Sequence, residues 1–134
     1  MKNFIVIGAV LAGLAVLIGA FGAHALKELM SESNIATFET GSRYHFYHSI
    51  ALLFVGLMSY RWNSKLLKYA GICFVIGILF FSGSLYLLAL KDGWGLESWK
   101  WLGPMTPIGG LFFIIGWILI VIGVLKSKEN VREL

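Results

Sequence analysis

The sequence predicts an all-α membrane protein, an up-down-up-down bundle of four transmembrane helices with both termini in the cytoplasm. Three observations predict it. Of the 134 residues, 58% are hydrophobic and 13% are charged, whereas soluble domains contain about 25% charged residues. The apolar residues gather in four segments, and Lys and Arg are divided unequally among the connections. Residues 1–134 are expected to form one domain, because the chain is too short for more.

Each apolar segment is long enough to cross a bilayer as a helix, which takes roughly 17–25 residues. Backbone groups in hydrocarbon have no water to bond, so each segment is expected to be helical. The first segment ends in Ala23-His24-Ala25, like a signal peptide. Its apolar run exceeds the roughly 7–15 residues of a signal core, so we expect it to be retained. The expected helices span approximately 4–25, 44–60, 66–90 and 108–125.

Lys and Arg determine the expected orientation, because cytoplasmic loops carry an excess of them. This rule predicts that both termini and the middle connection face the cytoplasm, in a multi-pass protein of the plasma (inner) membrane. The net charge of +4 then reflects topology and does not indicate nucleic-acid binding. Seven basic residues lie on the inner side, Lys2, Arg61, Lys65, Lys68, Lys126, Lys128 and Arg132, and four on the outer side, Lys27, Arg43, Lys91 and Lys100.

The outer connections carry residues typical of a membrane interface. Segment 26–34 has apolar residues at helical spacing and is expected to be a short interfacial helix. Asn34 is a candidate cap for the second helix, and Glu39 with Arg43 forms a favourable i,i+4 pair, so that helix can begin outside the bilayer. Pro107 is acceptable in the first turn of the fourth helix.

Small residues recur every seven positions in all four segments. Such a repeat keeps one seam of each helix facing its neighbours, and small residues let helices approach closely in lipid. We therefore expect tight packing with little room for a wide pore. The repeated positions are Gly8, Ala15 and Gly22; Ser49 and Gly56; Ala70, Gly77 and Ser84; and Gly109, Gly116 and Gly123.

The three histidines all fall at the outer end of the first two helices. Imidazole is the commonest metal ligand, so His24, His45 and His48 are candidates for holding a metal ion or haem iron, with Glu39 near enough to add an oxygen. The other interpretation, which we favour, is that they are interface residues that hydrogen-bond tyrosines and loop carbonyls. The candidate outer polar cluster comprises His24, Glu39, Arg43, Tyr44, His45 and His48.

The apolar segments contain few groups suited to catalysis or transport. Ser82 and Ser84 are expected to bond backbone carbonyls or a neighbouring helix, since no G-x-S-x-G motif accompanies them. Asp, Glu, Lys and Arg are absent from the interior of all four segments, which argues against a proton-coupled transporter. Trp117 is expected to pack within the bundle and to need a partner for its N–H.

Four motifs in order carry a family resemblance: Gly19-Ala-Phe-Gly-Ala-His-Ala-Leu26, Thr40-Gly-x-x-Tyr-His-x-Tyr-His48, Phe81-Ser-Gly-Ser-Leu-Tyr86, and Thr106-Pro-Ile-Gly-Gly110 followed by Gly116-Trp117. Over roughly residues 8 to 123 the chain resembles the family called domain of unknown function 423, whose animal relative is transmembrane protein 256. The resemblance implies a small bacterial inner-membrane protein and no particular activity. The expected helix-packing residues are Gly19, Gly22, Gly77, Ser82, Gly83, Ser84, Tyr86, Thr106, Pro107, Gly109, Gly110 and Gly116.

Three functions are compatible with these observations. The leading one is a non-enzymatic membrane protein that acts by packing, alone or as a homo-oligomer, or against a membrane-protein partner or the lipid bilayer, through its small-residue seams. The second is an outward-facing site for a metal, haem or quinone built on the three histidines. The third is a small transporter or oligomeric channel. The sequence specifies no cofactor.

Overall fold

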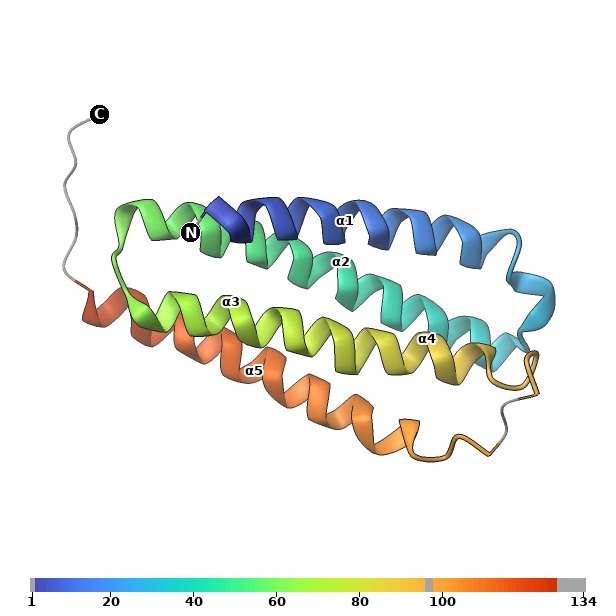
Figure 1. The fold of residues 1–134 in the computed structure, drawn as a ribbon. Helices are drawn as coiled ribbons and strands as arrows, with labels where there is room; N and C mark the ends of the chain where they lie inside the picture. The colour runs from blue at the N-terminus through green and yellow to red at the C-terminus, as the bar shows by residue number, and fades with distance from the viewer. Residues whose placement is uncertain (1, 96–97, 128–134) are drawn as a thin grey trace.

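The computed structural model describes residues 2–95 and 98–127, which form helices and connections without strands. Four long helices run antiparallel to one another in chain order (Figure 1). They are α1 (Lys2–Ala23), α2 (Glu32–Arg61), a continuous helix Lys65–Leu90, and α5 (Leu102–Lys126). The predicted inner residues Lys128 and Arg132 lie outside the described residues.

The helix Lys65–Leu90 contains an irregular turn near its middle. It consists of α3 (Lys65–Gly77), the π-helical turn η2 (Ile78–Ser82) and α4 (Gly83–Leu90). At the end of the turn the Gly83 N–H bonds the carbonyl of Ile78, five residues earlier. Single π turns inside α-helices recur at functional sites and widen the helix locally. This one packs against both α2 and α5.

Three of the long helices are long and apolar enough to cross a membrane: α1, Lys65–Leu90 and α5. The fourth, α2, is more polar, because its N-terminal half carries Glu32, Glu39 and Arg43. It lies between α1 on one side and α3, η2 and α4 on the other, and α5 packs against α3 and η2. The most polar helix is thus flanked by apolar ones.

Every position of the spacing-seven stripe is buried. A methyl group on Gly8 would meet the backbone of Ser49 and Leu53, and one on Gly116 would meet the Phe74 ring at 2.6 Å. These contacts leave no room for a side chain, so the small residues let the helices approach closely. The stripe faces inward along all four helices.

The apolar core fills the space between α2, α3 and α5. Leu52, Leu67 and Phe74 are fully buried, with 0% of their surface exposed, and Phe113 of α5 packs against them. Outward-facing residues of α1 and α5, such as Val6 and Val121, are by contrast large, apolar and exposed. Such an outer surface suits contact with lipid chains.

The second helix begins at Glu32, so the predicted bound at residue 44 is wrong, whereas the expectation that the helix can begin before its apolar stretch, near Asn34, agrees with the structure. The cap is Ser31, whose hydroxyl accepts a hydrogen bond from the Asn34 N–H at 3.3 Å, and not Asn34. In the second turn of α2, Phe38 is buried and contacts Gly22 of α1. Segment 26–34 is correspondingly shorter than expected, with only a 3₁₀ turn, η1 (Lys27–Leu29), before α2.

The first and fourth helices also differ from their predicted bounds. The helix α1 ends at Ala23 instead of residue 25, and the Leu26 N–H turns back to bond the Phe21 carbonyl at 3.0 Å. The helix α5 begins at Leu102, not at residue 108, because Leu102 is buried and anchors its first turn. Pro107 therefore lies in the second turn, where it removes one helical hydrogen bond.

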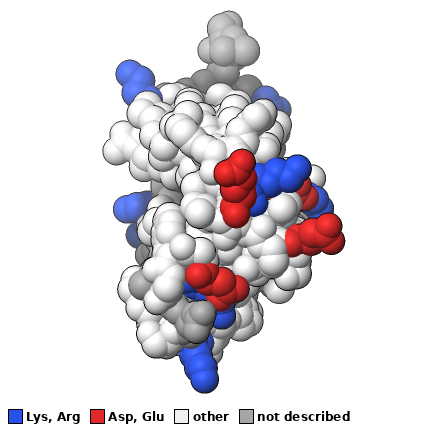
Figure 2. Space-filling model, turned by 90° about the vertical axis from the view of Figure 1, so that its right-hand side faces the viewer, with Lys and Arg blue, Asp and Glu red and all other residues white. Residues whose placement is uncertain are grey.

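The two ends of the bundle differ in charge. The N-terminus, the α2–α3 connection and the end of α5 lie together at one end (Figure 1), where the described charged side chains are all basic. Figure 2 shows the opposite end, on which acidic and basic side chains lie close together. The basic residues of the first end are Lys2, Arg61, Lys65, Lys68 and Lys126, and the acidic residues toward the second are Glu28, Glu32, Glu39 and Asp92.

Candidate functional site

The structure does not bring the three predicted histidines together. His24 is exposed just after α1, and its Nδ1–H donates to the Ala20 carbonyl at 3.0 Å. His45 and His48 are buried on α2 and face different helices. Among the described residues, no three His, Cys, Asp or Glu side chains lie close enough to hold a metal ion. The predicted polar cluster is therefore divided among several places.

His48 uses both of its ring nitrogens inside the bundle. Its Nδ1–H donates to the Tyr44 carbonyl at 2.8 Å, and its Nε2 accepts a hydrogen bond from the Trp117 Nε1–H at 3.2 Å. Because indole N–H is only a donor, this arrangement requires the neutral imidazole protonated on Nδ1. The ring stacks on Phe113 with centroids 3.4 Å apart. His48 therefore joins α2 to α5 and has no nitrogen left for a metal.

His45 faces α4 and is only partly satisfied. Its Nδ1 is hydrogen-bonded to the Tyr86 hydroxyl at 3.1 Å, and the Ser49 hydroxyl donates to its carbonyl at 2.7 Å. Within the described chain, two buried side-chain atoms have no hydrogen-bond partner, His45 Nε2 and the Ser82 hydroxyl. The expected bond from Ser82 to a backbone carbonyl or a neighbouring helix is therefore wrong. A buried polar group without a partner costs about 1–3 kcal/mol. Both belong to the part of the core where α2 meets η2 and α4.

Ser84 forms a contact between two helices, as the sequence predicts. Its hydroxyl lies 2.7 Å from that of Thr106, and it bonds the Phe81 carbonyl of its own helix at 2.9 Å. One turn along α5, a side chain on Gly109 would strike the backbone of Phe81. The close approach of α5 to the preceding long helix thus depends on a hydroxyl pair with α4 and on a glycine against η2.

The other predicted packing residues are not equivalent. Those that contact a neighbouring helix are Gly19, near the Ser42 hydroxyl, Gly22, against Phe38, Gly77, against Phe113, Gly110, beside the Phe81 ring, Gly116, against Phe74, and Tyr86, whose ring lies 4.9 Å from that of Phe38. Gly83 has open space where a side chain would be, so its assignment to helix packing is wrong. Pro107 is exposed.

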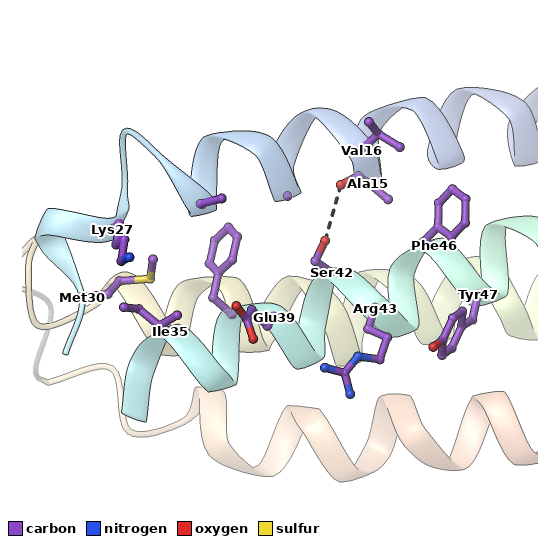
Figure 3. Close-up of a pocket in the computed structure, with 14 residues that line it drawn as sticks. Ala15, Val16, Lys27, Met30, Ile35, Glu39, Ser42, Arg43, Phe46 and Tyr47 are labelled. Atoms are coloured by element: carbon purple, nitrogen blue, oxygen red, sulfur yellow. Dashed lines mark hydrogen bonds between the residues drawn. The ribbon is translucent and has the colours of Figure 1, made fainter. Parts of the chain in front are cut away.

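A pocket of about 550 Å³ lies between α1 and α2 at the end where they connect (Figure 3). Its two walls are held together by the Ser42 hydroxyl, which donates to the Ala15 carbonyl at 3.4 Å. Small residues of α1 form one wall and create the space, because they fill little of the gap between the helices. The apolar part of the lining consists of Ala15, Val16, Gly19, Gly22, Ala23, Met30, Ile35, Phe38 and Phe46.

Three charged side chains line the same pocket, Lys27 of η1 and Glu39 and Arg43 of α2. Glu39 and Arg43 are exposed, and within the described chain none of the three forms a hydrogen bond or an ion pair. Figure 3 shows them in order along the pocket, with Lys27 near the end of the bundle, Glu39 next and Arg43 deeper. An apolar pocket with a charged rim can hold an amphiphilic molecule.

A second cavity, of about 540 Å³, lies on the face formed by α2 and α5. His48, Trp117 and Pro107 are part of its lining, and among the described residues no Asp, Glu, Lys or Arg is. Two of its polar side chains, Trp117 and His48, already bond each other. It therefore offers a ligand mainly apolar contact.

Comparisons with known proteins identify a family and relatives that are named as membrane proteins. The family model described as "Protein of unknown function (DUF423)" matches residues 18–110. A "UPF0382 membrane protein" of Staphylococcus epidermidis is 45% identical over 126 residues, 94% of this chain and 98% of the relative. "UPF0382 membrane protein YwdK" of Bacillus subtilis is 39% identical over 127 residues, again 94% of this chain and 98% of the relative. No solved structure matches the chain.

Proposed function

The chain belongs to the DUF423 family and is a membrane protein, and we propose that it crosses the plasma membrane four times and binds membrane lipid in the pocket between α1 and α2. In this proposal both termini are cytoplasmic, and the protein is not an enzyme. The observation that carries it is the pocket itself, whose walls are apolar and whose rim bears three charged side chains.

Four crossings are supported by the antiparallel arrangement of the helices. The helix α2 has 30 residues, which corresponds to about 45 Å and exceeds the thickness of the hydrocarbon core. Its C-terminal half, from Tyr44 to Tyr60, contains no Asp, Glu, Lys or Arg. The uniformly basic end of the described bundle then faces the cytoplasm.

The orientation can be tested by labelling single cysteines in intact cells. In a Cys73→Ala background, a cysteine at exposed Glu32 is expected to react with a membrane-impermeant maleimide. A matched cysteine at exposed Asn63, in the α2–α3 connection, is expected to react only after the membrane is permeabilised. The reverse pattern would contradict the proposed orientation. Reaction of both positions in intact cells would place both ends of α2 outside and would contradict its crossing of the membrane.

We propose lipid as the partner, and not a protein, because the small-residue stripes already pack against other helices of this chain. The stripe positions of all four helices face inward and are buried. They therefore hold this chain together and are not free to pack a second copy or another protein. The α1–α2 pocket, by contrast, opens on the side of the bundle, where its exposed residues Glu39 and Arg43 would meet lipid.

The charge on Arg43 favours the same partner. An arginine that faces the membrane is costly unless it reaches the interface or pairs with an anion. The exposed Arg43 has neither hydrogen bond nor ion pair within the described chain. Phosphate headgroups are the abundant anions at this depth, and basic pockets between membrane helices are known to bind them.

The proposal can be tested by measuring the lipid that stays with the full chain after purification in mild detergent. Ala23→Phe places a ring in the pocket, whereas Ala9→Phe places the same ring on the exposed surface of α1 away from it. Stoichiometric phospholipid is expected with the wild-type protein and the Ala9 variant, and much less with the Ala23 variant. Equal lipid in all three proteins would overturn the proposal.

A further inference from the structure

The charged residues of the α1–α2 pocket are arranged in an order that distinguishes one lipid headgroup from another. Glu39 and Arg43 are four residues apart on α2 and line the same pocket, so they are separated by about 6 Å along the helix axis. Glu39 is the nearer of the two to the end of the bundle, and Arg43 is deeper (Figure 3). The pocket therefore presents an anion nearer to the end of the bundle and a cation farther from it.

A phospholipid that enters the pocket from the side has its groups in a matching order. Its acyl chains lie deepest, its phosphate lies above them, and any substituent on the phosphate lies nearest to water. The apolar side chains of Val16 and Phe46 line the same pocket as Arg43, and they lie on the α1 side of α2, whereas the Arg43 side chain extends away from α1 (Figure 3). Acyl chains at that level place the phosphate within reach of the guanidinium, which can donate two parallel hydrogen bonds to it.

Glu39 determines what the substituent on the phosphate must be. Its carboxylate is exposed and, within the described chain, has no cationic partner. An ammonium group joined to the phosphate by a two-carbon linker reaches about one helical turn beyond it, which is the spacing from Arg43 to Glu39. A headgroup that is only anionic leaves the carboxylate facing negative charge, which is unfavourable.

We infer that the pocket selects a zwitterionic aminophospholipid, with its phosphate at Arg43 and its ammonium group at Glu39. This inference rests on the proposed lipid-binding function and names the class of lipid. Lys27 lies at the rim and adds general attraction for phosphate groups at the surface. A volume of about 550 Å³ accommodates a headgroup and the upper parts of the chains, and the rest of the lipid stays in the bilayer.

The experiment uses the full chain, stripped of native lipid and offered equal amounts of phosphatidylethanolamine and phosphatidylglycerol with identical acyl chains. Bound lipid is counted by native mass spectrometry. The wild-type protein is expected to prefer phosphatidylethanolamine by roughly tenfold, about one charge-assisted contact. Glu39→Gln is expected to abolish this preference while lipid still binds. Arg43→Gln is expected to weaken the binding of both lipids.

The exchange of the two charges, Glu39→Arg with Arg43→Glu, is the matched control. This variant keeps the net charge, the composition and the two positions of the charged residues, and it reverses only the order of the charges. Phosphatidylethanolamine is expected to lose its advantage in this variant. An unchanged preference would show that the order of charges does not select the lipid, and the inference would then be wrong.

The failures of the inference and of the proposed function are distinguishable. Equal binding of both lipids to the wild-type protein, with binding reduced by Ala23→Phe, would overturn the headgroup assignment and leave the lipid site intact. No retained lipid of either kind would overturn both. A lipid-free dimer that is dissociated by Ala23→Phe would also overturn both, because a second copy would then cover the pocket.

Discussion

The helix α2 carries polar side chains on two sides, and the two sides differ in the burial and hydrogen bonding of these side chains. Toward α4 and α5, His45 and His48 are buried, with 4% and 5% of their surface exposed, and they bond Tyr86 and Trp117. On its exposed side, Glu39 and Arg43 line the pocket that α2 forms with α1 and have no partner within the described chain. The polar groups of the first side join helices within the bundle. Those of the second side are free to contact another molecule.

The comparison shows that polar residues close together in a membrane-helix sequence need not form one site. A helix advances by about 100° per residue, so residues 39 and 43 share one face while 45 and 48 share another. Hydrogen bonds completed inside the bundle, such as the Trp117 to His48 bond at 3.2 Å, indicate a structural role. Exposed charges without a partner in the described chain are available to a ligand. Four predictions test this distinction.

The largest effect is expected from closing the narrow seam on the buried side. Gly109→Ala puts a methyl group against the backbone of Phe81, which cannot move aside as a flexible side chain would. We expect a loss of about 1–3 kcal/mol or more in the free energy of unfolding, measured by reversible unfolding in mixed detergent. Gly13→Ala, which meets open space, is the control and is expected to cause no loss. Equal stability of the two variants would contradict the packing described here.

The next effect concerns the hydrogen bond from Trp117 to His48. Trp117→Phe leaves His48 Nε2 without its partner, and His48→Phe leaves the Trp117 N–H without one while a ring remains against Phe113. Each change is expected to reduce stability by about 1 kcal/mol. The double-mutant cycle is expected to yield a coupling energy of about 0.6 kcal/mol and at most about 1.7. A coupling energy of zero would mean that the two side chains act independently.

The buried side of α2 was partly predictable from the sequence. Small residues spaced by seven identify the seams because only they allow close approach in lipid, and the stripe from Gly109 to Gly123 is buried as the repeat suggests. The chemistry of the indole N–H predicted a partner for Trp117, but the expectation that this residue packs within the bundle is wrong, since 49% of its surface is exposed. The sequence did not identify His48 as that partner, because periodicity states which residues share a face and not which neighbouring helix faces them.

The start of α2 and the pocket were not predictable in the same way. Hydropathy alone starts the second helix near residue 44, because the preceding residues are polar, and the candidate cap at Asn34 indicates only that the helix can begin earlier. Phe38, which packs on Gly22 of α1, and the Ser31 cap extend the helix to Glu32. The pair Glu39 and Arg43 was visible in the sequence as an i,i+4 pair. Its place in a pocket depends on the opposing small residues of α1, such as Gly19, and these can be matched to it only in three dimensions.

A smaller effect is expected on the pocket side, and it should appear only when lipid is present. Arg43→Gln removes an exposed charge without a partner in the described chain, so lipid-free protein in detergent is expected to change by less than about 0.5 kcal/mol. Added phospholipid should raise the melting temperature of the wild-type protein, because it binds the folded state only, and raise that of the variant less. A large loss of stability without lipid would assign Arg43 a structural role and remove the contrast between the two sides.

The smallest effect is expected at His24, which belongs to neither side of α2. Its one hydrogen bond joins Nδ1–H to the carbonyl of Ala20 in the preceding turn, and its side chain is exposed. His24→Gln is therefore expected to change stability by less than about 0.5 kcal/mol. Elemental analysis of protein purified without chelator is expected to show no stoichiometric metal in either form, since no three potential ligands meet among the described residues. Stoichiometric metal that disappears in the His24 variant would place this histidine with His45 in a common site in the membrane. The orphaned His45 Nε2 is the nitrogen that such a site would use, because both nitrogens of His48 are already engaged.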